Sequence, residues 1–305
     1  MSAADRPQST RLSVLIPVAI VTAIWGSTWI VITGQLGIVP PSWSVTYRFL
    51  IGGLAMLAWA LWRRESLRFD ARGWGFALAL GTAQFVLNFN FVYRAETFIT
   101  SGLVAVVFAL MLVPNAVLAR IFLGQRLGTQ LLIGSAIAIA CVALLFVHEL
   151  RADPSGGAKL YAGIGFTLAA VLSASSANIL QGTKTAKLYP MAAMLGVSML
   201  MGAALDAVYA WATVGPPVID PRPVYWLGTL YLGLAASAIA FPLYFGVIRV
   251  IGPAKAAYSG VLVPVIAMLL STLFEGYRWS LLAAAGAALA MVGLVVALTA
   301  RRPNR

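Results

Sequence analysis

LSVLIPVAIVTAIWGSTWIVITGQLGIVPPSWSVTY, residues 12–47, contains no Asp, Glu, Lys, Arg or His. A helix of about 20 apolar residues spans the hydrocarbon core of a bilayer, so this run is long enough for two such helices. Gly34, Gly37, Pro40 and Pro41 interrupt the run, which predicts a turn between two membrane spans. The stretch therefore predicts a polytopic membrane protein.

The composition of the whole chain agrees with this interpretation. Of its 305 residues, 61% are hydrophobic and 10% are charged, whereas soluble domains carry roughly 25% charged residues. Further charge-free runs follow along the chain, and we predict an all-α fold with ten transmembrane helices. Their expected positions are residues 13–33, 43–62, 73–92, 98–120, 128–147, 159–183, 190–213, 225–248, 254–274 and 279–300.

The formal charge of +12 raises the question of a nucleic-acid partner. The basic residues are scattered through short loops and do not gather on one face, which argues against nucleic acid. With the N-terminus inside, 15 Lys and Arg lie in cytoplasmic segments and 6 lie on the other side. Since Lys and Arg are retained in the cytoplasm, we expect both termini there.

The halves of the chain resemble one another. A shift of 150 residues places Pro114 over Pro264 and Gln125 over Glu275. Each predicted half has five helices, an odd number, so the second half must enter the membrane from the opposite side. Chance alignment of apolar sequence is the alternative. Inverted repeats favour alternating access around a site near the membrane midplane. The expected segments are a tail (1–12), repeat one (13–150), a linker (151–158), repeat two (159–300) and a basic tail (301–305).

Three motifs carry a family resemblance. They are Trp-Gly-Ser-Thr at 25–28, Gly-Gln-Arg-Leu at 124–127 and Glu-Gly-Tyr at 275–277, the last two after Pro-containing helices. The chain resembles the EamA-type branch of the drug/metabolite transporter superfamily, and most of all the YddG-type amino acid exporters of bacterial inner membranes. The resemblance implies a central cavity lined by the first, third, fourth, sixth, eighth and ninth helices. Gln125 departs from the family pattern, which has Glu there.

Polar residues at membrane depth mark candidate cavity walls, because an unsatisfied amide in hydrocarbon is costly. In the third helix, helical spacing predicts that Gln84, Asn88 and Phe91 share one face. A hydrogen bond between helices is an equally good interpretation of the two amides. Further candidates lie in the first helix, at its counterpart in the sixth, and in the eighth and ninth: Trp25, Thr28, Ser175, Asn178, Tyr244, Tyr258 and Ser259.

Pro114 and Pro264 each deprive a carbonyl, at Leu110 and Gly260, of its helical partner. The freed carbonyls could bind a cationic group, but a bend or hinge is the favoured interpretation.

Ionisable residues are scarce in the predicted spans. We expect only Asp206 well inside a span, with a local partner, while Arg48 and Glu96 lie near interfaces. This pattern predicts a neutral cavity without Lys or Arg, suited to zwitterionic solutes and unsuited to phosphorylated ones. Because no pair of buried carboxylates is expected, the choice between proton coupling and facilitated diffusion stays open.

Other function classes find little support. The single Cys141 excludes a disulfide within the chain and a cysteine-based metal site, so no metal or cofactor is expected. An intramembrane transferase would need clustered acid and base groups, and no Gly-rich loop for ATP occurs. The resemblance implies an exporter of amino acids, aromatic and other neutral ones included, that needs no ATPase subunit and is a monomer or weak homodimer. Export of other small drug-like metabolites is the alternative.

Overall fold

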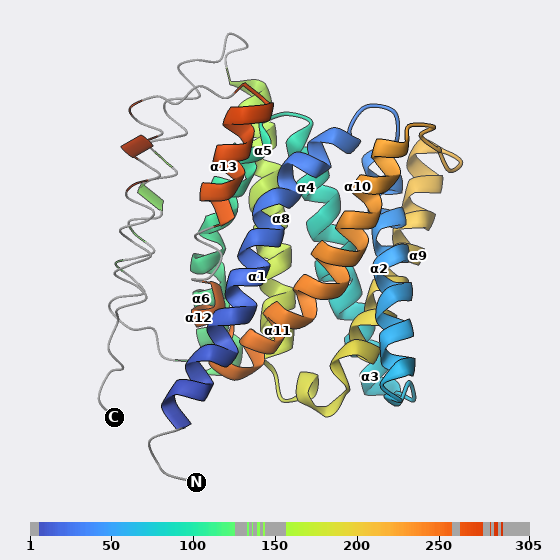
Figure 1. The fold of residues 1–305 in the computed structure, drawn as a ribbon, viewed down its shortest axis with the longest axis vertical. Helices are drawn as coiled ribbons and strands as arrows, with labels where there is room; N and C mark the ends of the chain where they lie inside the picture. The colour runs from blue at the N-terminus through green and yellow to red at the C-terminus, as the bar shows by residue number, and fades with distance from the viewer. Residues whose placement is uncertain are drawn as a thin grey trace.

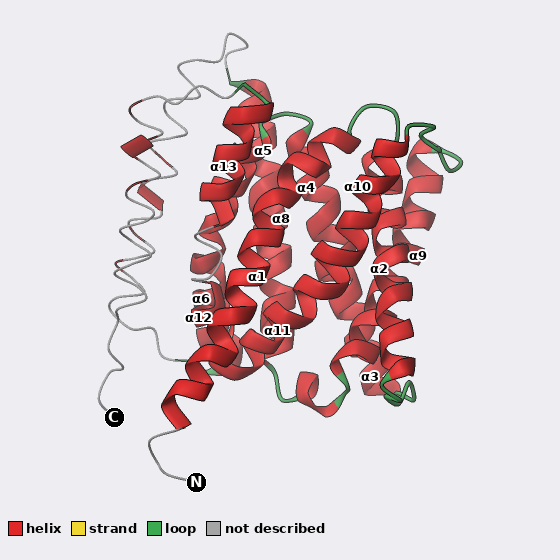
Figure 2. Ribbon diagram, in the orientation of Figure 1, coloured by secondary structure: helices red, strands yellow, loops and turns green. Residues whose placement is uncertain are grey.

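A computed structural model describes residues 6–125, 157–257 and 263–276, with isolated positions between 133 and 143 and between 281 and 288. Within these ranges every regular element is a helix (Figure 2). The predicted fifth and tenth helices, 128–147 and 279–300, lie outside the described residues apart from the isolated positions.

Seven described helical segments are long and apolar enough to cross a membrane: Val14–Gln35, Pro41–Trp62, Ala71–Glu96, Ser101–Leu123, Ala158–Gly182, Met191–Val214 and Pro223–Ile251. They correspond to seven of the ten predicted spans. The predicted helix 254–274 is described in two pieces, the short α12 (Pro253–Ala256) and α13 (Val263–Phe274). A multi-pass helical membrane protein is thus confirmed, while the total of ten spans stays a prediction.

The first four spans run alternately up and down. They are α1 (Arg6–Gln35), α2 (Pro41–Trp62), a third span made of α3 (Ala71–Leu80), η1 (Gly81–Asn88) and α4 (Phe89–Glu96), and a fourth made of α5 (Ser101–Phe108), η2 (Ala109–Met111) and α6 (Leu112–Leu123). The later spans are α8 (Ala158–Gly182), α9 (Met191–Val214) and an eighth made of α10 (Pro223–Gly233), η4 (Leu234–Ile239) and α11 (Ala240–Ile251).

In Figure 1, α1 begins at the lower face of the bundle and α8 at the upper face. The helices that open the two halves therefore run in opposite directions, as inverted repeats require.

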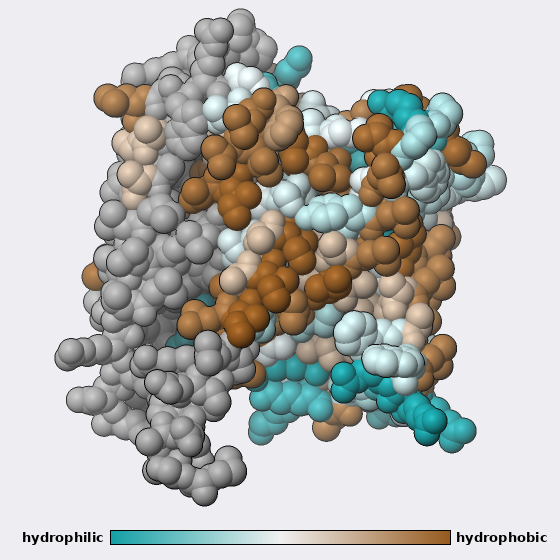
Figure 3. Space-filling model, in the orientation of Figure 1, coloured by the Kyte–Doolittle hydropathy of each residue, from teal (hydrophilic) through white to brown (hydrophobic). Residues whose placement is uncertain are grey.

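The surface separates apolar walls from a charged end. In Figure 3 apolar side chains cover much of the middle of the visible face, and hydrophilic ones gather at its lower end. The exposed basic residues of the lower loops are Arg63, Arg64, Arg68, Arg72, Lys184 and Lys187. This charge supports the predicted cytoplasmic side, although the orientation itself stays a prediction.

Local signals fix where the helices start. Pro41 and Pro223 stand at the first turns of α2 and α10, where a missing N–H costs nothing. Asp70 caps α3, since its Oδ1 accepts the N–H of Gly73 at 2.8 Å and also the hydroxyl of Tyr189 at 2.6 Å. These two hydrogen bonds, the one from Tyr189 foremost, hold the pKa of Asp70 below its usual value.

Each half contains a π-helix in its third span: η1 in the first half and η4 in the second. Both lie where backbones cross at close range. A Cβ on Gly81 would stand 2.7 Å from the carbonyl oxygen of Ser198 on α9, and one on Gly233 would stand 3.0 Å from that of Arg48 on α2. Only glycine permits such an approach.

The partner helices supply glycines too. A Cβ on Gly52 of α2 would lie 3.1 Å from the carbonyl oxygen of Gly233, and one on Gly202 of α9 would lie 3.4 Å from that of Gly81. We call these contacts the α2–η4 crossing (Gly52 and Gly233) and the α9–η1 crossing (Gly202 and Gly81). Gly202 stands 150 residues after Gly52, and Gly233 stands 152 after Gly81. The two crossings are therefore equivalent contacts of the two repeats.

The fourth span is broken near its middle by the 3₁₀ turn η2, which includes Leu110. Pro114 follows as the third residue of α6 and leaves the carbonyl of Leu110 without its helical donor. Pro264 is the second residue of α13, and residues 258–262 before it lie outside the described part. A hinge role for either proline stays a prediction.

Candidate functional site

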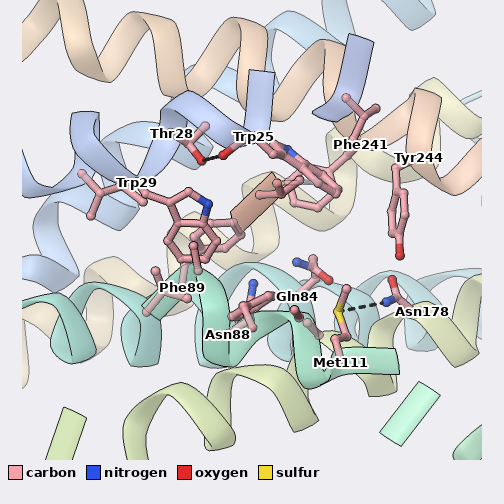
Figure 4. Close-up of a pocket in the computed structure, with 18 of the residues that line it drawn as sticks. Trp25, Thr28, Trp29, Gln84, Asn88, Phe89, Met111, Asn178, Phe241 and Tyr244 are labelled. Carbon is pink, nitrogen blue, oxygen red and sulfur yellow. Dashed lines mark hydrogen bonds between the residues drawn. The ribbon is translucent and has the colours of Figure 1, made fainter. Parts of the chain in front are cut away.

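A cavity of about 90 Å³ lies between the two halves of the bundle. Since one water molecule needs roughly 10–15 Å³ of such space, the cavity can hold several waters or a small solute. Its walls come from α1, α2, the third and fourth spans, α8 and α11 (Figure 4). The two halves thus meet around a chamber, the arrangement that alternating access needs.

Six residues singled out from the sequence line this cavity: Trp25, Thr28, Gln84, Asn88, Asn178 and Tyr244. Two other candidates lie away from this lining. Phe91 packs against Phe166 of α8, with ring centroids 6.2 Å apart, and Ser175 is fully buried away from the cavity lining. Tyr258 and Ser259 lie outside the described residues. Solute binding by any of these side chains stays a prediction.

The π-helix η1 explains why Phe91 leaves the face of Gln84 and Asn88. The predicted common face assumed α-helical spacing throughout the third span. A π-helix pairs residue i with i+5 and so holds more residues in each turn. Residues beyond η1 are therefore rotated relative to those before it, and Phe91 turns toward α8.

Aromatic rings form two walls of the cavity. In Figure 4, Trp25, Phe241 and Tyr244 stand on one side and Trp29 and Phe89 on the other. Trp25 meets Phe241 and Tyr244 edge-on, at centroid distances of 5.3 and 5.0 Å. Its indole N–H donates to the carbonyl of Ala236 in η4 at 3.1 Å. The ring of Trp25 is therefore available to contact a solute, while its indole N–H already forms a hydrogen bond within the protein.

Amide side chains cover the side opposite Trp25. Asn178 donates to Oδ1 of Asn115 at 3.4 Å and to the sulfur of Met111 at 3.5 Å. Gln84 and Asn88 come from η1, and Oδ1 of Asn88 is buried without a hydrogen-bond partner. A solute in the cavity would meet an acceptor there that no group of the described residues satisfies.

Arg48 is the functional candidate that the sequence reasoning missed. Its side chain is 1% exposed and lines the cavity. Nε donates to Oγ of Ser237 at 3.2 Å, and the guanidinium carbon lies 4.2 Å from the ring centroid of Phe89. The expected interfacial position of Arg48, and the expected absence of Lys or Arg at depth, are therefore wrong. Arg48 lies two turns inside α2, at the α2–η4 crossing.

Two acidic groups meet at the upper end of the bundle. Glu96 is 7% exposed. The hydroxyl of Thr33 lies 2.9 Å from Oε2 of Glu96 and 3.2 Å from Oε1 of Glu275. Ser101 donates to Oε2 of Glu275 at 2.6 Å. Two carboxylates, one buried and one partly exposed, thus share one hydroxyl. These contacts tie α1, α4, α5 and α13 together above the cavity.

Asp206 of α9 has a partner from another span, not a local one as expected. It is fully buried, and its Oδ1 accepts a hydrogen bond from Nδ2 of Asn90 at 2.6 Å. It does not line the cavity. No group of three His, Cys, Asp or Glu gathers as a metal-ligand set in the ranges that the structure covers.

Comparison with known proteins agrees with this architecture. The EamA-like transporter family matches residues 12–147 and again residues 161–299. The chain is 24% identical to protein PagO of Salmonella typhimurium over 272 residues, 88% of each protein. It is 28% identical to the uncharacterized inner membrane transporter YedA of Escherichia coli over 253 residues, 82% of this chain and 78% of YedA.

Two more distant likenesses complete the comparison. The chain is 23% identical to the probable amino-acid metabolite efflux pump of Escherichia coli, over 91% of this chain and 92% of that protein. A solved crystal structure shares the fold with a TM-score of 0.71 at 22% identity, covering 96% of this chain and 100% of the other. Two successive family matches, a helical bundle of apolar spans and a chamber between its halves agree, and the chain belongs to the EamA-like transporter family of multi-pass membrane transporters.

Proposed function

We propose that the protein exports amino acids, aromatic and other neutral ones included, across a bacterial inner membrane by alternating access through the central cavity. The observation that carries this proposal is the composition of the cavity wall. Aromatic rings, amides and one arginine face a single chamber between the two halves. Rings suit an apolar side chain, and the polar groups suit the charged end of an amino acid.

Because Arg48 lines the cavity, the argument for a zwitterionic substrate is different from the one made from the sequence. The proposed substrate class is the same. The sequence favoured zwitterions because the cavity seemed neutral, whereas a guanidinium lines it. A zwitterion satisfies both a guanidinium and neutral acceptors such as Oδ1 of Asn88. The relative named as a probable amino-acid metabolite efflux pump supports the same class. A place near the YddG-type exporters is part of this proposal.

The setting in the cell is also proposed. The basic lower loops favour a cytoplasmic lower face with both termini inside. Repeats at 13–150 and 159–300 would rock against each other around the cavity. We propose that the transporter works as a monomer or weak homodimer without an ATPase subunit, and that it is not an enzyme.

Counterflow in liposomes tests the proposal. The full chain is reconstituted with an internal pool of one amino acid, and uptake of labelled amino acids is measured with and without a proton gradient. Neutral and aromatic amino acids are expected to exchange, and sugar phosphates are not. A panel in which no amino acid exchanges while other small metabolites do would establish the alternative substrate class and reject ours.

Variants connect the flux to the cavity. Trp25→Ala and Asn88→Ala are expected to lower amino acid counterflow by roughly tenfold or more, because each removes a lining group. Trp62→Ala is the matched control, since Trp62 is 81% exposed on the outer wall. Folding is checked by thermal melting in detergent. Wild-type flux in both cavity variants would mean that solutes do not pass through this chamber.

A further inference from the structure

No carboxylate oxygen of the described residues lies within 4.0 Å of the guanidinium of Arg48. Among the described residues, Arg222 and Asp220 form the only ion pair within 4.0 Å. Glu96, an acid of the neighbouring third span, bonds to Thr33 instead. A buried charge without a directly contacting ion-pair partner is unfavourable. The fold nevertheless places this cation in the wall of its central cavity.

The protein holds Arg48 in place without neutralising it. Ser237 accepts the Nε–H, and its own hydroxyl donates to the carbonyl of Leu232 in α10. Phe89 and Phe49 lie 4.2 and 5.3 Å from the guanidinium carbon, at distances where aromatic rings attract a cation. Nη1 is buried and has no hydrogen-bond partner. A donor is thus left for another group.

A carboxylate is the chemical group that matches the donors in this wall. A guanidinium presents parallel N–H donors that match the two oxygens of a carboxylate. A further donor, Nε1 of Trp29, is also buried without a partner in the same wall. Oδ1 of Asn88 is an unsatisfied acceptor that suits an ammonium group. The cavity therefore offers donors to an anion and an acceptor to a cation, the two ends of an α-amino acid.

We infer that Arg48 binds the carboxylate of the transported solute and makes the transporter select carboxylate-bearing amino acids over their amides and amines. This inference rests on the proposed function, and it names the residue and the functional group on which selection depends. Ser237 acts through Arg48 as a positioning residue, because it orients the guanidinium.

Matched competitors test the inference. Counterflow of labelled leucine into liposomes that contain the full chain is inhibited with unlabelled leucine or with leucinamide, which lacks the negative charge. In the wild type, leucinamide is expected to compete roughly tenfold to a hundredfold less well, the range typical of hydrogen bonds to charged groups. In Arg48→Gln, leucine is expected to weaken to the level of leucinamide, so that the ratio falls to about one.

Two further variants test the same inference if Arg48→Gln does not fold. Arg48→Lys keeps the charge without the planar fork and should give an intermediate ratio. Ser237→Ala removes the hydrogen bond that holds Nε of Arg48. It should lower the selectivity for leucine over leucinamide severalfold, while the protein still melts like the wild type.

The outcomes separate the two proposals. If the wild type exchanges no amino acid, the proposed function fails. If it exchanges leucine but treats leucinamide equally, or if an Arg48 variant keeps the wild-type ratio, the role of Arg48 is rejected and amino acid export stands.

Discussion

The α2–η4 crossing and the α9–η1 crossing share one backbone design and differ in their side chains. In the first, the carbonyl of Arg48 faces Gly233, and in the second the carbonyl of Ser198 faces Gly81. The arginine side chain reaches the cavity, whereas the hydroxyl of Ser198 is fully buried without a partner. The difference indicates that close glycine contacts maintain the backbone arrangement that both repeats share. Only the α2–η4 crossing carries a charged side chain.

Asp206, a second buried ionisable group, also has no charged counterpart in the other half. Asp206 lies on α9 and bonds to Asn90, and the residue 150 positions earlier is Met56, which is buried. One half thus directs a cation into the cavity, and the other keeps an acid among its packed helices. Substitutions in these regions can test separately how the backbone contacts affect stability and how the side chains affect transport.

The largest expected effect is a loss of stability when a glycine of a crossing is replaced. Gly81→Ala should destabilise the protein by about 1–3 kcal/mol, because its new methyl would meet a backbone carbonyl that cannot turn aside. Gly233→Ala should also destabilise the protein, since its new methyl would stand 2.8 Å from the side chain of Ile51 and 3.0 Å from the carbonyl oxygen of Arg48. Thermal melting in detergent measures both. Gly246→Ala is the control, with no heavy atom within 4 Å of its new Cβ, and equal melting of all three would disprove the crowding.

An intermediate effect is expected at Asp206. Asp206→Val leaves Asn90 without this partner and should cost about 0.6 kcal/mol, at most about 1.7, as for other hydrogen bonds between membrane helices. Amino acid counterflow should be unchanged, because Asp206 does not line the cavity. Asp206→Asn, which keeps a hydrogen-bonding group, should melt close to the wild type. A loss of flux in both variants would instead place Asp206 in the transport step.

The smallest effect is expected at Ser198. Ser198→Ala removes a buried hydroxyl that has no partner, so stability should change by no more than about 0.5 kcal/mol in either direction. Counterflow should match the wild type. This variant is the counterpart of the Arg48 substitutions in the other half, and a strong loss of flux would show that both crossings take part in binding.

The sequence was sufficient for the class of fold, because the spans are encoded locally by long runs without charge. Six cavity residues were also predictable, since a polar side chain in hydrocarbon must face protein or water. Arg48 and Glu96 were not, because their burial depends on helices distant in the chain. Thr33 and Glu275, for example, join Glu96 from different spans. Phe91 was misplaced because no local pattern revealed the π-helix.

The paired π-helices also say something about ancestry. A π-turn contains one residue more than an α-turn, so a single inserted codon in a helix is enough to create one. Gly81–Asn88 and Leu234–Ile239 occupy the same span in each half. Two independent insertions at matching places are less economical than one in a common precursor. On this reasoning, we expect a half-length homologue with a single copy to carry the same bulge.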